Sequence, residues 1–215
     1  AQTGSGSAVT LIPENSICSL LVPNSDIGVI WRNRLFDDSS WAPANTGVGY
    51  DYGNLIGSNA DVQSQMDEIN GSVYIRVPFA VDDPAALTSL TLRMKYDDGF
   101  AAYLNGTLVA SAQAPTNPQW NSLATGDHPD SSALVFVDFN ITADLNLLEP
   151  GSNVLAIQGL NGTLGSSDLL ILPQLDATTA ATNPGLGGAD YFQIATPATT
   201  NGTNQGLPAE AVSFS

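Results

Sequence analysis

The stretch Tyr96-Asp97-Asp98-Gly99-Phe100-Ala101-Ala102-Tyr103-Leu104-Asn105-Gly106 decides the fold that we expect for this chain. It contains two dipeptides, Asp98-Gly99 and Asn105-Gly106, of the kind that supplies the positive φ angles of a tight hairpin turn. Between the two dipeptides, successive residues alternate with the period of two that is typical of a β-strand. The stretch therefore predicts one strand, residues 100–105, between two turns.

Further strands are predicted on both sides of this segment. Residues 90–96 have an apolar residue at every second position, and residues 107–110 follow the second turn. Three strands joined by two tight turns would form an antiparallel meander. Other strand-like segments lie at 8–13, 17–22, 73–81, 134–141, 153–161 and 168–175. Helical spacing is limited to residues 61–69 and to a turn after Thr142, so the pattern predicts an all-β antiparallel sandwich with little helix.

The composition changes towards the C-terminus. After residue 175 the chain is rich in Ala, Thr, Asn, Gly and Pro, with a short strand predicted at 191–194 and an extended linker from Thr196. Residues 211–215 again have the pattern of a strand. We therefore expect one sandwich domain over residues 1–195, followed over residues 196–215 by a linker and the first strand of a further domain.

The charge of the chain is strongly one-sided. Its 215 residues include 21 acidic and only five basic ones, and the formal net charge is −16. Nucleic acids and anionic membranes are disfavoured as partners because their phosphates would be repelled. An acidic surface is compatible with weakly bound cations, with neutral ligands such as sugars, or with solvation alone. No apolar run approaches the roughly 20 residues of a membrane-spanning helix, so membrane insertion is not expected.

Aspartate residues in the predicted turns are candidate ligands of a metal ion. Asp37-Asp38-Ser39-Ser40 is turn chemistry, because Asp and Ser side chains accept hydrogen bonds from nearby backbone N–H groups. A calcium loop is the alternative interpretation, since Ca²⁺ prefers several oxygen ligands. The candidate ligands of a structural calcium ion are Asp37, Asp38, Asp97 and Asp168.

The Asp97-Asp98 pair has two other interpretations. An acid–base pair for glycoside hydrolysis would need two carboxylates across a cleft. Neighbours in a hairpin point to opposite faces, so we favour turn residues. Because the chain has so few basic groups, we expect Arg76, on the strand 73–81, to neutralise Asp97 or Asp98 rather than to bind a ligand.

A loop of low periodicity, residues 111–131, contains Trp120. Loops of this length inside a domain are uncommon and often functional. An exposed aromatic side chain there could stack against a pyranose ring, whereas a buried one would hold the loop to the domain. Trp120, Tyr52 and Tyr50 are the candidate ligand-binding aromatic residues.

The sequence contains few of the residue combinations that catalysis requires. His128 is the only histidine, which excludes a zinc site built on several imidazoles and leaves any Ser-His-Asp triad dependent on it. Nucleophile-elbow, phosphate-loop and dinucleotide-binding fingerprints do not occur. Cys18 lies alone in an apolar run, which favours a buried structural thiol. We therefore do not expect an enzyme.

Several segments carry a resemblance to a known family. They are Tyr74-Ile75-Arg76-Val77-Pro78-Phe79, Tyr96-Asp97-Asp98-Gly99-Phe100 with Tyr103-Leu104-Asn105-Gly106, and Gly151-Ser152-Asn153-Val154-Leu155-Ala156. Together they resemble the galactose-binding-like jelly-roll domains attached to glycoside hydrolases and to large secreted bacterial proteins. Phe36-Asp37-Asp38-Ser39-Ser40-Trp41 followed by Gly47-Val48-Gly49-Tyr50 is similar to the opening of such a domain. The similarity covers about residues 30–175.

The resemblance implies a function as well as a fold. Members of this superfold include carbohydrate-binding modules, adhesion domains and spacers, so the fold alone identifies no site. We expect a non-catalytic carbohydrate-binding module of a larger secreted or cell-surface bacterial protein, with glycans and neighbouring domains as partners. The alternative is an adhesion or spacer domain that binds no small molecule.

Overall fold

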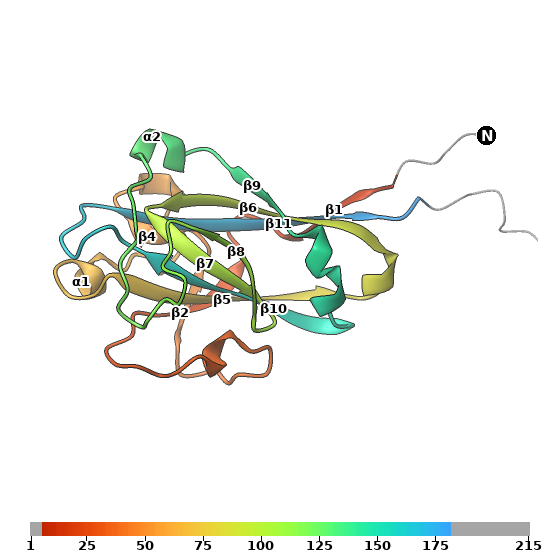
Figure 1. The fold of residues 1–215 in the computed structure, drawn as a ribbon, viewed down its shortest axis with the longest axis horizontal. Coiled ribbons are helices and arrows are strands. Elements are labelled where there is room, and N and C mark those ends of the chain that lie inside the picture. Colours follow the sequence, from red (N-terminus) through yellow and green to blue (C-terminus); the bar gives the residue numbers. More distant parts are fainter. Residues whose placement is uncertain (1–5, 182–215) are drawn as a thin grey trace, which may run out of the picture. The chain divides into compact units, whose positions relative to one another are not determined.

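Two antiparallel β-sheets form the part of the chain that the computed structural model describes, residues 6–181 (Figure 1). The first sheet has the order β1 (Ala8–Ile12), β11 (Leu169–Thr179), β6 (Leu87–Asp97) and β9 (Val137–Asn140), and β4 (Val48–Tyr50) also pairs with β11. The second sheet has the order β3 (Ala42–Asn45), β2 (Ile17–Leu21), β5 (Ser72–Val81), β10 (Gly151–Leu160), β7 (Gly99–Leu104) and β8 (Thr107–Ala112). The predicted all-β antiparallel sandwich is confirmed.

Helical structure is confined to short connections. They are α1 (Gln63–Met66), α2 (Asp130–Ala133) and the 3-10 turns η1 (Ile30–Arg32), η2 (Gly53–Leu55), η3 (Pro84–Ala86) and η4 (Thr142–Leu147). Helical spacing predicted α1 and η4 correctly. The strand predicted at 134–141 is shorter than expected, because α2 and a turn precede β9. Within residues 6–181, no helix is long and apolar enough to cross a membrane.

Strand β5 shows why the core has two parts. Its alternate residues Val73, Ile75 and Val77 are buried between the two sheets, where they join the main hydrophobic cluster. Tyr74 and Arg76 face the other way and are nevertheless buried. That outer face of the six-stranded sheet is covered by a second cluster, which we call the outer aromatic cluster: Trp31, Trp41, Tyr74, Ala101, Tyr103 and Ala156. The central strands of this sheet are therefore buried on both faces.

The predicted meander is wrong at its first turn. Strand β6 pairs with β11 and β9 in the first sheet, whereas β7 pairs with β10 and β8 in the second sheet. Asp98-Gly99 thus carries the chain from one sheet to the other. Gly99 is suited to this crossing because an added Cβ would lie only 2.9 Å from the backbone oxygens of Ala112 and Gln113. The second turn is as predicted, with positive φ at Asn105 and Gly106 between β7 and β8.

Other expectations have mixed outcomes. Cys18 is buried as predicted, and this burial raises the pKa of its thiol to about 12. The domain boundary at residue 195, the strand at 191–194 and the linker with its following strand at 196–215 lie outside the described residues.

Candidate functional site

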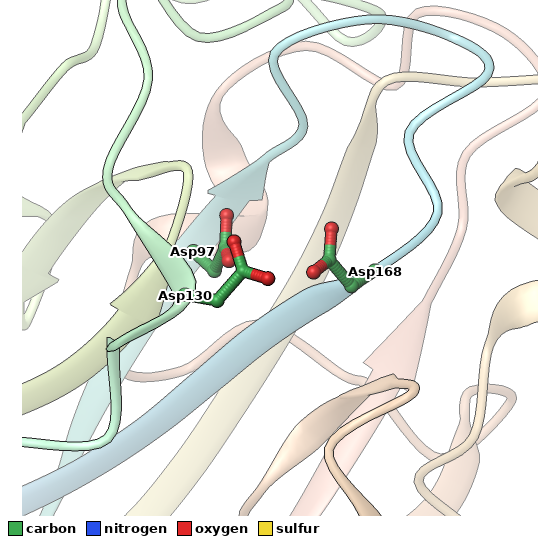
Figure 2. A group of neighbouring side chains, drawn as sticks. All are labelled: Asp97, Asp130 and Asp168. Atoms are coloured by element: carbon green, nitrogen blue, oxygen red, sulfur yellow. The ribbon is translucent and has the colours of Figure 1, made fainter. Parts of the chain in front are cut away.

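Three carboxylates converge at one end of the first sheet. Asp97 is the last residue of β6, Asp168 immediately precedes β11, and Asp130 begins α2. The antiparallel pairing of Leu170 with Asp97 places the end of β6 beside the start of β11. One carboxylate oxygen from each aspartate lies within 4.8 Å of the others, and Figure 2 shows the three side chains turned toward one another. We call Asp97, Asp130 and Asp168 the aspartate cluster.

Asp98 fastens the loops that carry the other two aspartates. Its Oδ2 accepts a hydrogen bond from the backbone N–H of Gly162 at 2.6 Å, and its Oδ1 accepts one from that of His128 at 3.4 Å. A Cβ at residue 162 would lie 2.8 Å from Asp98 Oδ2, so a larger residue there would displace the Asp98 carboxylate. His128 Nδ1 lies 2.8 Å from the Tyr96 carbonyl oxygen, to which it can only donate. Both loops are therefore held against the Asp97-Asp98 junction.

Two of the predicted aromatic residues, Tyr50 and Tyr52, stabilise this site through hydrogen bonds of their hydroxyl groups. Tyr50 is only 1% exposed; its hydroxyl donates to the Ser166 carbonyl at 3.0 Å and accepts from Asn161 Nδ2 at 2.8 Å. It thus holds the loop before Asp168 and has no free ring face for a sugar. The Tyr52 hydroxyl donates to Asp97 Oδ2. Burial, followed by this contact with Asp97, raises the pKa of Tyr52.

The negative charge of the aspartate cluster is not balanced by a basic side chain among the groups that shift its pKa values. Burial raises the pKa of Asp97 to about 7, an effect reinforced by Asp98 and Asp168 and opposed by the hydrogen bond from Tyr52. Burial also raises the pKa of Asp168, with further contributions from Asp130, Asp98 and Asp51. Every charged group that acts on these two carboxyls is itself acidic. Negative charge in one place without a basic partner favours a bound cation.

The aspartate cluster lies in a pocket of about 600 Å³. Its walls are Asp97, Asp98, Asp127, Asp130, Asp168 and small residues of the loops 124–126 and 162–167. A neighbouring hollow of about 330 Å³, which includes Tyr52, shares Asp130 and Asp168 with it. Carboxylate, hydroxyl and carbonyl oxygens are the ligands of hard divalent cations. A hydrolytic pair would instead hold its carboxylates on opposite sides of a sugar, whereas these three converge on one point.

The remaining predicted metal ligands, Asp37 and Asp38, lie elsewhere. Asp38 Oδ2 accepts a hydrogen bond from Arg76 Nε at 2.8 Å, and Asp37 Oδ1 accepts one from the backbone N–H of Ser39 at 3.0 Å. The expectation that Arg76 pairs with Asp97 or Asp98 is therefore wrong. Arg76 points outward from the six-stranded sheet, while Asp97 ends a strand of the other sheet.

Trp120 lies in a different pocket, of about 330 Å³. The Trp120 pocket is lined by Val22, Pro23, Asn24, Gln65, Ile69, Asn70 and Trp120. Trp120 is half-buried because it packs against the outer aromatic cluster, and the rest of its side chain faces the pocket. Its burial is thus intermediate between the two alternatives that the sequence left open. The three predicted aromatic residues do not form one binding surface, since Tyr50 is buried and Tyr52 lines a hollow that shares no residue with the Trp120 pocket.

Asp130 is the member of the aspartate cluster that sequence reasoning missed. It sits in the stretch 111–131, where no hydrophobic periodicity indicates its position, and only the packing of that loop against Asp98 brings it to Asp97. The available signal was the concentration of acidic residues, Asp127 and Asp130, in a long loop already suspected of function.

Comparison with known proteins gives a likeness of fold. No protein-family model matches the chain, and no curated protein sequence matches it. A β-glucuronidase of Bacteroides uniformis matches 80% of this chain with 16% identity and a TM-score of 0.51. The structure of Bacteroides uniformis β-glucuronidase 2, covalently bound to cyclophellitol-6-carboxylate aziridine, matches 80% with 17% identity and a TM-score of 0.51. The match covers only 18% of each enzyme chain, so this chain corresponds in fold to a small β-sandwich part of much larger proteins.

Proposed function

We propose that this chain is a non-catalytic module of galactose-binding-like type that binds a glycan and belongs to a larger secreted or cell-surface bacterial protein. The observation that carries the proposal is the likeness of its β-sandwich to 18% of two β-glucuronidase chains. A part of that size in an enzyme is suited to an accessory role beside a separate catalytic domain.

The Trp120 pocket is the glycan site that we propose. Sugar sites combine an aromatic or apolar surface with a few polar groups that fix orientation. Trp120 and Ile69 supply the apolar surface, and the exposed amides of Asn24 and Gln65 supply donors and acceptors for hydroxyl groups. Tyr50 and Tyr52 do not take part, because their hydroxyl groups support the aspartate cluster.

We further propose that the aspartate cluster binds calcium with a structural role. Ca²⁺ takes six to eight oxygen ligands in flexible geometry, and this pocket offers three converging carboxylates with Ser and Thr residues around them. A cation there would join the end of β6, the loop before α2 and the loop before β11. It would offset both the burial and the neighbouring negative charges that raise the pKa of Asp97 and Asp168.

A spacer domain without a small ligand is the second candidate. It is favoured because Trp120, Tyr50 and Tyr52 do not line one common pocket, and because much of the Trp120 side chain is buried. A glycan array with the wild-type chain and the Trp120→Ala variant separates the two functions. Binding to a glycan that is lost in Trp120→Ala, with an unchanged circular dichroism spectrum, supports the module; no binding to any glycan supports the spacer.

A further inference from the structure

We propose that the ligand of the Trp120 pocket is an uncharged saccharide and that sugar carboxylates are excluded from it. This inference rests on the proposed glycan binding and adds the chemical class of the sugar. It depends on the side chains that line the pocket and on the absence of a basic side chain among them.

The lining of the Trp120 pocket contains no charged side chain. Its apolar part is formed by Val22, Pro23, Trp120 and Ile69, and Ile69 is 66% exposed. The Asn70 amide is already used, because its Nδ2 donates to the Pro23 carbonyl and its Oδ1 accepts from the backbone N–H of Ser72. The amides that remain for a ligand belong to Asn24 and Gln65. Neutral amides suit hydroxyl groups and offer no counter-charge to a carboxylate.

None of the five basic side chains of the chain lines this pocket. Arg76, Arg93 and Lys95 pair with carboxylates of the domain itself. The Arg32 guanidinium lies over the Tyr103 ring at 4.2 Å from its centroid, and Arg34 donates to the Ser152 carbonyl at 3.3 Å. A uronate bound beside Trp120 would therefore meet no cation in the lining of the pocket.

The acidic residues next to the pocket in the sequence do not line it. The Glu68 carboxylate lies beside the loop 162–167, where a Cβ on Gly165 would be 2.5 Å from its Oε1, and Asp67 acts on Tyr50. The exclusion of a uronate therefore rests on the uncharged lining, which gives a carboxylate no counter-charge for the hydration that it loses on binding. The enzymes of similar fold are named for glucuronides, and the residues of this pocket predict the opposite preference.

The test uses an array that presents neutral hexoses and the matching hexuronates in pairs: glucose with glucuronate, galactose with galacturonate and mannose with mannuronate. We expect the wild-type chain to favour the neutral member of its preferred pair by about tenfold, equivalent to roughly 1.4 kcal/mol, because a carboxylate would lose hydration without gaining a counter-charge. Trp120→Ala should lose binding to that sugar.

A variant that adds a positive charge to the pocket sharpens the test. Gln65→Arg places a cation in the pocket and should raise uronate binding by about tenfold. Gln63→Arg adds the same charge to α1 at an exposed residue that does not line the pocket, and should leave uronate binding unchanged. Equal gains in the two variants would show that only net charge matters and would overturn the inference.

The other outcomes separate this inference from the proposed function. Preferential uronate binding that disappears in Trp120→Ala overturns the exclusion of carboxylates and leaves the glycan-binding function standing. Glycan binding that persists in Trp120→Ala overturns the pocket assignment alone. No binding by a folded wild-type chain to any sugar overturns both proposals.

Discussion

Two groups of carboxylates in this domain have opposite electrostatic surroundings. On the six-stranded sheet, Asp38 pairs with Arg76, which is 3% exposed and also donates to the backbone carbonyls of Trp31, Asn33 and Phe36. At the end of the five-stranded sheet, the aspartate cluster has only acidic neighbours acting on it. With five basic residues against 21 acidic ones, the fold cannot pair every carboxylate. The position of Arg76 decides which of the two groups has a basic partner within the described residues.

The largest expected effect comes from removing Arg76. Arg76→Met keeps an unbranched apolar side chain but removes the donors to Asp38 and to three backbone carbonyls. We expect the free energy of unfolding to fall by about 3–5 kcal/mol, because the buried groups left without partners keep their desolvation cost. Urea denaturation measures this loss.

Arg93→Met is the matched control. Its ion pairs with Asp138 and Asp176 are partly exposed to solvent, so the loss should stay below about 1 kcal/mol. Equal losses in the two variants would contradict the view that Arg76 organises the segment around Asp38.

The second effect is a gain of stability on addition of calcium. After treatment with a chelator, Ca²⁺ at about 100 times its dissociation constant should raise the free energy of unfolding by about 2.7 kcal/mol. Asp130→Asn and Asp168→Asn should abolish most of the gain, whereas Asp37→Asn should retain it because Asp37 lies outside the aspartate cluster. Melting curves with and without Ca²⁺ provide the measurement. A full gain in Asp130→Asn would exclude this residue as a ligand.

The third effect is the pH dependence of the calcium-free protein. Burial raises the pKa of Asp97 to about 7, above the unfolded value of about 3.9. Between these two values the folded state holds a proton that the unfolded state has released, so stability falls as pH rises from about 4 to about 7. We expect Asp97 to contribute at most about 1.4 kcal/mol per pH unit to this fall.

Asp97→Asn isolates the contribution of that carboxyl. Denaturation at several pH values in chelator should give a steeper decline for the wild-type chain than for the variant, since the amide does not titrate. Parallel curves would show that Asp97 ionises at its ordinary pKa. Saturating Ca²⁺ should remove the difference in slope, because the cation favours the ionised carboxyl.

Much of the fold follows from local patterns. The alternation in residues 73–81 predicts β5 because each of its faces meets a different apolar cluster. Asn105-Gly106 predicts the turn between β7 and β8 because the required positive φ is a local property. Asp98-Gly99 has the same local chemistry but joins two sheets, since strand pairing is decided by β9, β10 and β11, which lie far away in the sequence.

The residues of the candidate site are harder to predict from local sequence patterns. Acidic composition points to Asp97 and Asp168, yet their proximity depends on the pairing of β6 with β11. The pairing of Arg76 with Asp38 depends on which sheet β5 joins, and Asp130 is positioned by a loop without periodicity. Long-range contacts therefore determine both carboxylate groups, and a single sequence read locally carries little information about them.

The smallest effect concerns the hydroxyl of Tyr52, which donates to Asp97. This hydrogen bond lowers the pKa of Asp97 against the stronger effect of burial, so Tyr52→Phe should raise that pKa further. In calcium-free protein we expect a loss of about 1 kcal/mol at pH 8, where Asp97 is ionised, and a smaller loss at pH 5, where it is protonated. Tyr103→Phe alters a hydroxyl on the outer aromatic cluster and should show no such difference between the two pH values. Equal losses at pH 5 and pH 8 in Tyr52→Phe would mean that its hydroxyl acts on packing and not on the charge of Asp97.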